Sequence, residues 1–123
     1  MIALALTTTL VATAAPAWQE PPRGSETRSA MMDAVRPFAE SDMGAPVIFI
    51  VRDLRVEGNL GFASLDPIRP GGGTAGERVH ALYQRSSVGW SVADWSVGAT
   101  EEWWSAPEIC AVWQSVIPEF CEG

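Results

Sequence analysis

The chain has 123 residues, which is the length of a single domain, and 47% of them are hydrophobic, enough to build a core. It carries 15 acidic and 8 basic side chains, all of the basic ones arginine, for a formal net charge of −7. Binding to nucleic acids or to anionic membranes depends on basic side chains that neutralise phosphates. The acidic balance therefore argues against both classes of partner.

Residues 1–17 are typical of a secretory signal peptide. They carry no charge, are mostly apolar and contain A-x-A spacing at residues 12–14 and 15–17. No basic residue precedes the apolar stretch, and three threonines interrupt it, so a cytosolic N-terminus is the alternative. The run is shorter than the roughly 20 apolar residues of a membrane-spanning helix. We therefore expect a periplasmic or secreted protein with no stable membrane span.

A proline-containing linker follows over residues 18–24, and then a pattern with helical spacing over residues 25–40. Ser25 is suited to cap this helix, and the apolar positions that recur on one face are Met31/Met32, Val35 and Phe38/Ala39. Pro37 does not fit inside a straight helix, so we expect a kink or a restart there. Gly44 and Pro46 mark the end of the helical segment.

Four strand-like segments come next, over residues 47–58, 60–68, 78–86 and 89–98. Strict alternation places Leu54 on the same face of the first strand as Ile48 and Ile50. The first half of that strand is apolar on both faces, which favours a buried central strand or one covered by the helix. The glycine-rich residues 69–77 lack the spacing of a phosphate-binding loop, and we interpret them as a hairpin loop that is a candidate for partner contact.

The C-terminal region, residues 106–123, predicts a short helical tail. Cys110 and Cys121 are the two cysteines, and in an oxidising compartment such a pair is most simply a disulfide. Its short loop contributes about 2–3 kcal/mol on the chain-entropy estimate. A zinc site needs four ligands and the chain has a single histidine, so neither a metal nor another cofactor is expected.

These elements predict an α+β fold, with an N-terminal helix packed on a four-stranded antiparallel meander sheet over residues 25–105, followed by the disulfide-linked tail. The motifs "AVRP", "V-x-F-x-V-x-x-L-x-V-x-G-x-x-G-F-A" and "W-x-V-x-x-W-x-V-G-x-T" fall within residues 28–100. In these motifs the chain resembles a group of small, mostly uncharacterised exported proteins of proteobacteria. The resemblance implies a helix and curved sheet similar to the cystatin-like and ketosteroid-isomerase-like rolls, folds that serve enzymes, carriers and inhibitors alike.

Six tryptophans make the chain rich in this residue. We expect Trp90, Trp95 and Trp113 to belong to the core, because a domain of this size needs the large area that each one buries. Alternation places Trp90 with Val92 on one face of the last strand, and Ala93, Trp95 and Val97 on the other. Trp103 and Trp104 are adjacent and point in different directions on a helix, so they are the candidates for an exposed surface that binds a ligand or partner.

His80 and Asp94 are the weak candidates for catalysis. His80 is the one side chain that titrates near neutral pH by default, and Asp94 is expected on the neighbouring strand. In a ketosteroid-isomerase-like cone, Asp94 would serve as the proton-abstracting base. The plainer interpretation is a surface histidine and a strand aspartate, and it is the favoured one.

No combination of nucleophile and base, no metal-ligand set and no cofactor motif stands out in the sequence. We therefore expect a non-enzymatic binding module of the cell envelope, whose partner is a protein or a small apolar ligand. The alternative is a ketosteroid-isomerase-like cone that acts as a carrier of a small apolar ligand or as an enzyme. The sequence does not indicate the oligomeric state.

Overall fold

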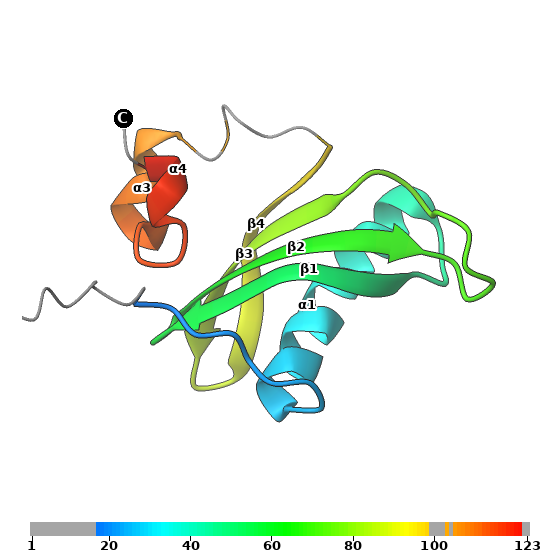
Figure 1. Cartoon of the computed structure of the whole chain (residues 1–123), viewed down its shortest axis with the longest axis horizontal. Coiled ribbons are helices and arrows are strands. Elements are labelled where there is room, and N and C mark those ends of the chain that lie inside the picture. The colour runs from blue at the N-terminus through cyan, green and yellow to red at the C-terminus, as the bar shows by residue number, and fades with distance from the viewer. Residues whose placement is uncertain (1–16, 99–102, 104, 122–123) are drawn as a thin grey trace, which may run out of the picture.

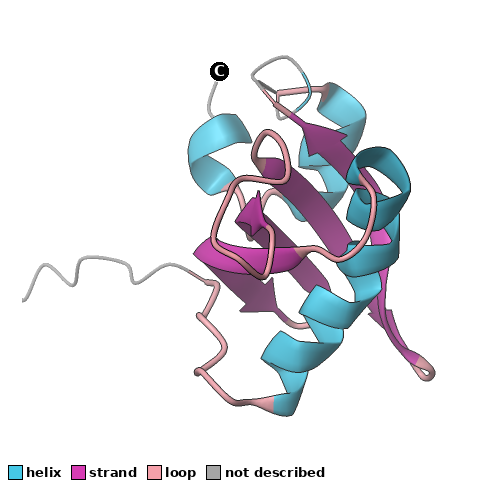
Figure 2. Ribbon diagram, turned by 90° about the vertical axis from the view of Figure 1, so that its right-hand side faces the viewer, coloured by secondary structure: helices cyan, strands magenta, loops and turns pink. Residues whose placement is uncertain are grey.

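The computed structural model describes residues 17–98, 103 and 105–121, and these residues form an α+β fold as predicted. The sheet has the strand order β1-β2-β3-β4 with every neighbouring pair antiparallel, which confirms the predicted meander. Helix α1 lies along one face of this sheet, and the C-terminal helices lie over one end of the other face (Figures 1 and 2). The elements are α1 (Glu26–Met43), β1 (Ile48–Glu57), β2 (Leu60–Ile68), β3 (Val79–Ser86), β4 (Gly89–Val97), α3 (Pro107–Trp113) and α4 (Pro118–Cys121).

Helix α1 begins where the sequence predicts. The Ser25 hydroxyl accepts a hydrogen bond from the amide of Arg28 at 3.3 Å and so satisfies one free donor of the first turn. The helix continues through Pro37 to Met43, so the expected restart does not occur. Proline occupies an exposed position there, on the side of the helix away from the sheet. The buried positions are Met31, Met32, Val35 and Ala39, whereas Phe38 is 39% exposed.

The end of α1 is held by a distant arginine. Gly44 has a positive φ of 83° and its amide donates to the Glu40 carbonyl at 2.8 Å. The last turn contains no basic residue. Instead, Arg69, at the start of the β2–β3 loop, donates to the carbonyls of Met43 and Gly44 at 2.6 Å each, and to that of Pro46 at 3.1 Å. Its guanidinium therefore supplies the positive charge that a helix C-terminus favours.

A β-bulge in β1 overturns the alternation predicted for that strand. The register shifts between Val51 and Asp53, which leaves Arg52 as the extra residue. Leu54 therefore returns to the helix face, where it is 1% exposed, and does not share a face with Ile48 and Ile50. The strand is also an edge strand, so the expectation of a buried central strand is wrong.

A second bulge lies in β4. The register shifts between Val92 and Asp94, which leaves Ala93 as the extra residue. All four large apolar side chains of the strand consequently pack against the helix-side core, although strict alternation had placed them on opposite faces; they are Trp90, Val92, Trp95 and Val97. Each bulge increases the local twist of its strand.

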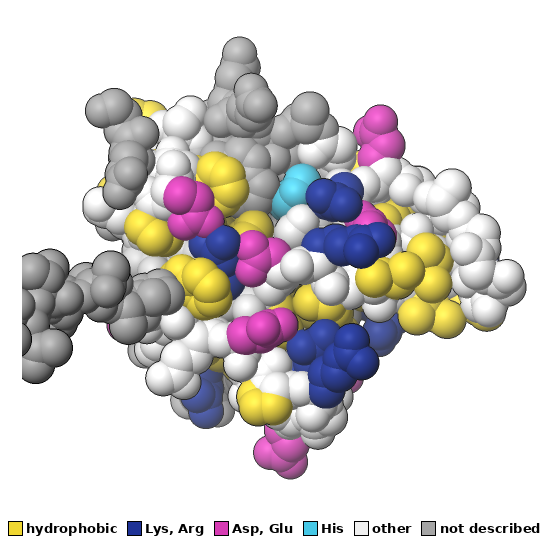
Figure 3. All heavy atoms as spheres, viewed as in Figure 1, with side chains coloured by type: hydrophobic (Ala, Val, Ile, Leu, Met, Phe, Trp, Pro, Cys, Tyr) yellow, Lys and Arg dark blue, Asp and Glu magenta, His cyan; other side chains and the backbone are white. Residues whose placement is uncertain are grey.

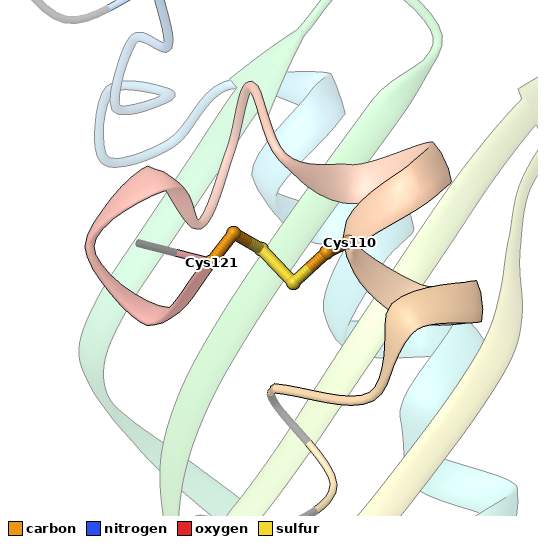
Figure 4. The surroundings of a disulfide bond; sticks show 2 residues. All are labelled: Cys110 and Cys121. Carbon is orange, nitrogen blue, oxygen red and sulfur yellow. A yellow bond between two sulfur atoms is a disulfide. The ribbon is translucent and has the colours of Figure 1, made fainter. Parts of the chain in front are cut away.

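The C-terminal tail forms a second, smaller core on the opposite face of the sheet. Phe62 and Leu82 from the sheet meet residues of the tail, and Trp113 is 7% exposed there, as predicted for a core tryptophan. The tail residues buried in this core are Ile109, Trp113, Val116 and Ile117. The Cys110–Cys121 disulfide is confirmed, with a Cα–Cα distance of 5.6 Å, and it joins α3 to α4 (Figure 4).

Within the described part of the chain, no helix has the length and apolar character needed to cross a membrane. The predicted signal peptide lies almost entirely outside the described residues, which begin at Ala17.

Candidate ligand-binding site

The sheet face opposite α1 is only partly covered by the described residues. The tail helices lie over the end of the sheet that is farthest from the β2–β3 loop, as Figure 1 shows. Next to them is a surface depression of about 390 Å³. It is lined by Arg52, Asp53, Phe62, Ser64, Arg78, His80 and Phe120. Side chains from β1, β2, β3 and α4 therefore converge on one place.

A cluster of two arginines and one aspartate forms the charged side of the depression. Asp66, on β2, accepts hydrogen bonds from the Nε of Arg52 on β1 and, at 2.7 Å, from the Nε of Arg78 just before β3. The side chains of Arg52 and Arg78 are 53% and 49% exposed. Hydrogen bonding from Arg78, reinforced by Arg52, lowers the pKa of Asp66 despite its partial burial. The carboxylate is therefore ionised at neutral pH and holds two guanidinium groups at the surface.

His80 and Ser64 form the middle of the depression. They are directly opposite each other in the β2–β3 ladder, and Ser64 is 8% exposed. Burial, reinforced by the charge of Arg78, lowers the pKa of His80 to about 4. The imidazole is therefore neutral at pH 7 and has one donor and one acceptor nitrogen. Figure 3 shows this histidine, the single one of the chain, at the surface beside arginine side chains.

Arg55 connects the depression to the second core. It is 9% exposed and forms two hydrogen bonds with Asp53, at 3.0 and 2.9 Å, one with the carbonyl of Val116 at 3.0 Å, and an ion pair with Glu119. Its guanidinium also lies over the ring of Trp18 at 4.3 Å. Burial alone would lower the pKa of Arg55, but its hydrogen bonds to Asp53 and Glu119 outweigh that effect and raise it.

The two catalytic candidates lie on the same face of the sheet, but Asp94 is already engaged in hydrogen bonds. His80 is opposite Ser96 in the β3–β4 ladder and Asp94 is opposite Leu82, so His80 and Asp94 are diagonal neighbours. The two carboxylate oxygens of Asp94 accept hydrogen bonds from the indole of Trp103 at 2.8 Å and from the amide of Trp95 at 2.9 Å. Asp94 thus holds the segment before α3 against the sheet.

Trp103 is half-buried and packs against the second core. Trp104 lies outside the described residues, as does the predicted cap at residues 100–102. The proposal of a contact surface built by Trp103 and Trp104 therefore stays a prediction. Among the described residues, no group of three or more histidine, cysteine, aspartate or glutamate side chains is placed to hold a metal ion.

Sequence reasoning missed the arginine cluster and Ser64. The relevant residues are spread over three strands, and only the register brings them together. One signal in the sequence could have indicated the cluster. Arg52, Asp66 and Arg78 are charged residues in or next to strand segments that are otherwise rich in apolar residues. Comparisons with protein-family models, with curated protein sequences and with solved structures yield no match.

Proposed function

We propose that this chain is an exported binding module of the cell envelope. Its open sheet face captures a small ligand that has one anionic group and a compact apolar part. The observation that carries the proposal is the depression itself, because exposed guanidinium groups and aromatic side chains line the same hollow of the sheet. Binding sites characteristically combine apolar walls with a small number of placed polar groups.

Charge supports the anionic end of the ligand. Arg52 and Arg78 share the single carboxylate of Asp66, so these three residues together keep one positive charge, while Asp53 in the same depression is paired with Arg55. Each guanidinium has five N–H donors, and Asp66 engages the Nε of Arg52 and the Nε and Nη2 of Arg78. The remaining donors are suited to a carboxylate or a phosphate, which arginine binds in a planar, two-point geometry.

The other side of the depression supports the apolar end. Phe62 forms part of the floor and is 2% exposed, whereas Phe120 stands at the rim and is 38% exposed. Between them and the arginines lie Ser64 and the neutral imidazole of His80, which make this part of the depression polar without adding charge. A ligand with a ring or a short branched chain next to its acid group matches this order of side chains.

Three features support export. Residues 1–17 have the pattern of a signal peptide. The Cys110–Cys121 disulfide fits an oxidising compartment such as the periplasm or the exterior. The resemblance of residues 28–100 to exported proteobacterial proteins points the same way.

The alternative, a ketosteroid-isomerase-like cone, needs a cavity between the helix and the sheet. In the described residues that space holds fully buried side chains, among them Met31, Val35, Leu65 and Tyr83. Asp94, which would be its base, is on the other face of the sheet and already accepts two hydrogen bonds. This geometry favours a surface binding module over an enclosed carrier or enzyme.

The binding proposal is tested by NMR titration of the isotope-labelled protein with phenylacetate, and with benzyl alcohol as the uncharged analogue. We expect shifts of the Ser64, His80 and Phe120 signals with phenylacetate, and much smaller ones with benzyl alcohol. The variant Arg78→Gln should abolish the difference, whereas Arg85→Gln, a matched change at the far end of β3, should preserve it. Equal shifts with both compounds, or shifts elsewhere, would refute the proposed site.

Export is tested by mass spectrometry of the protein expressed in a bacterial host and recovered from the periplasmic fraction. We expect a chain that is cleaved near Ala17 and is lighter by the hydrogens that disulfide formation removes. A full-length, reduced chain in the cytosol would contradict export and leave the binding proposal standing.

A further inference from the structure

The edge of β1 borders a groove on the helix side of the sheet. Among the described elements, helix α1 makes most of its sheet contacts with β4 and β3, and a surface groove lies between α1 and the first half of β1. The groove has a volume of about 530 Å³. One wall is the α1 stripe of Arg28, Met32 and Arg36, spaced four residues apart, and the other is the strand segment Phe49–Val51.

The chain itself shows that β1 accepts another strand at this edge. Gln19 pairs with Val56 in antiparallel fashion, with backbone hydrogen bonds of 2.8 and 2.9 Å. The pairing stops there because Pro21 and Pro22 have no amide hydrogen to donate. The chain then leaves the edge and enters α1.

The other half of the edge stays open. From Ile48 to Val51, the outer side of β1 makes no backbone hydrogen bond with any other described residue. At one end of this strip, Val47 is engaged by side chains of Glu40 and Arg36. At the other end, the bulge at Arg52 interrupts the flat strand. An exposed edge of this kind is a template for pairing with another chain.

The charged side chains that line the groove favour an acidic partner. Arg23, Arg28 and Arg36 line the groove, which is three of the chain's eight basic residues. Asp33 pairs with Arg36 at 2.8 Å, Glu20 lies 4.0 Å from Arg28, and the Glu40 carboxylate accepts from the Val47 amide, so Arg23 is the arginine of the groove without an ion pair among the described residues. The chain as a whole has a net charge of −7. An acidic segment is therefore attracted to this groove and repelled by most other surfaces of the molecule.

The side chains next to the edge define the pattern of the partner. Phe49 and Val51 face the groove together with the arginines, whereas Ile48 and Ile50 are 44% and 41% exposed on the other face. A strand added to β1 alternates its side chains between these two surroundings. Acidic residues alternating with aliphatic ones would place carboxylates near the arginines and apolar groups beside the isoleucines.

We propose that the groove between α1 and β1 is a docking site for an extended acidic segment of another protein, which adds to β1 as a fifth strand. Such strand addition takes affinity from backbone hydrogen bonds and specificity from the alternate side chains. The site is separate from the depression on the opposite face, so the two proposals stand or fall independently.

The test uses the full chain and two synthetic peptides, acetyl-Glu-Val-Glu-Val-Glu-Val-amide and the same peptide with lysine in place of glutamate. We expect the glutamate peptide to bind, to slow amide exchange at residues 48–51, and to weaken as ionic strength rises from about 0.05 M to about 0.5 M. The lysine peptide should not bind. Binding of both peptides, or protection along β4 in place of β1, would overturn the proposal.

The charge requirement is tested with Arg23→Glu, because Arg23 is exposed and has no ion pair among the described residues. Together with Arg28→Glu it should weaken binding of the glutamate peptide by about tenfold or more. Arg85→Glu makes the same charge change as Arg23→Glu alone, at a distant site, and should alter binding by less than about twofold, which is less than the loss expected of Arg23→Glu. An equal effect of both changes would refute the groove as the binding site. Dimerisation of the free chain through β1, seen by light scattering, would also refute it.

Discussion

The two faces of the sheet are built on different principles. The face under α1 is closed by a continuous apolar core in which Val35, Leu65 and Val79 are fully buried. The other face carries a smaller core at one end and charged side chains in its centre. Stability is therefore concentrated on one side of the sheet, and the other side is left available for recognition. The predictions that follow probe that division, from the largest expected effect to the smallest.

The strongest contrast should come from two truncations of similar size, one on each face. Leu65→Ala removes a side chain that is fully buried under α1, and it should lower the free energy of unfolding by about 3 kcal/mol. Ile50→Ala, on the open face, should lower it by less than about 1 kcal/mol, because Ile50 is 41% exposed. Urea denaturation measures both values. Equal losses would show that the open face is covered in solution.

The disulfide should matter for the tail more than for the sheet. Replacing both cysteines, as Cys110→Ser with Cys121→Ser, should lower the free energy of unfolding by about 2–3 kcal/mol. Amide exchange should accelerate mainly in α3 and α4, while α1 keeps its protection. Uniform acceleration across the sheet would instead mean that the two cores unfold as one unit.

His80 should make stability depend on pH. Its pKa is lowered to about 4 from the ordinary 6.5, so the unfolded chain binds a proton between these values while the folded chain does not. Stability should thus be fully present above pH 6.5 and fall as pH drops toward 4, by at most about 1.4 kcal/mol for each pH unit. Chemical denaturation at a series of pH values measures this slope.

The control for that slope is His80→Asn, which cannot titrate. This variant should be less sensitive to pH between 7 and 5. Asp66 does not affect this comparison. Because its pKa is lowered in the folded protein, the stability that it contributes is lost only when the pH falls to the ordinary aspartate pKa of 3.8 and below. A variant with an unchanged slope would assign the pH dependence to other groups.

The smallest effect is expected at the hydrogen bond between Asp94 and Trp103. Asp94→Ala should lower the free energy of unfolding by about 1 kcal/mol, because it leaves the indole of Trp103 without its acceptor. The combined emission of the six tryptophans should shift to longer wavelength as the ring of Trp103 gains access to water. The double variant Asp94→Ala with Trp103→Phe should lose less than the sum of the two single variants; it still loses the bond from the Trp95 amide to Asp94, and a fully additive loss would contradict the coupling.

Much of the fold was predictable because its signals are local. The Ser25 cap, the end of α1 at Gly44 and the four strand segments follow from capping, turn and alternation rules applied to neighbouring residues. The two bulges were not predictable, since the extra residues Arg52 and Ala93 are recognisable only from the partner strand. Each bulge shifts every following side chain to the opposite face, which explains why alternation placed Leu54 and Trp95 on the wrong face of the sheet.

The candidate site was largely hidden for the same reason. The sequence indicated His80 by its chemistry but did not indicate its neighbours. Ser64 is next to His80 because of the register between β2 and β3, and Arg78 because it directly precedes β3. The predicted meander order does place the first strand at the edge of the sheet, whereas the apolar residues of that strand favoured a central position. Its apolar pattern resembles that of a buried strand, while its actual neighbours are decided by the order of the meander.

The last turn of α1 takes its positive charge from Arg69, a residue 25 positions beyond Gly44. Closing a loop of that length costs chain entropy, and this cost must be met before the hydrogen bonds of Arg69 can stabilise the helix end. We therefore expect the refolding protein to complete this turn late, after β2 has paired with β1 and placed the guanidinium. Pulse-labelling exchange during refolding should show the amides of residues 41–44 protected later than those of residues 31–35. If the end of α1 is protected first, the helix supports itself and Arg69 only joins a finished structure.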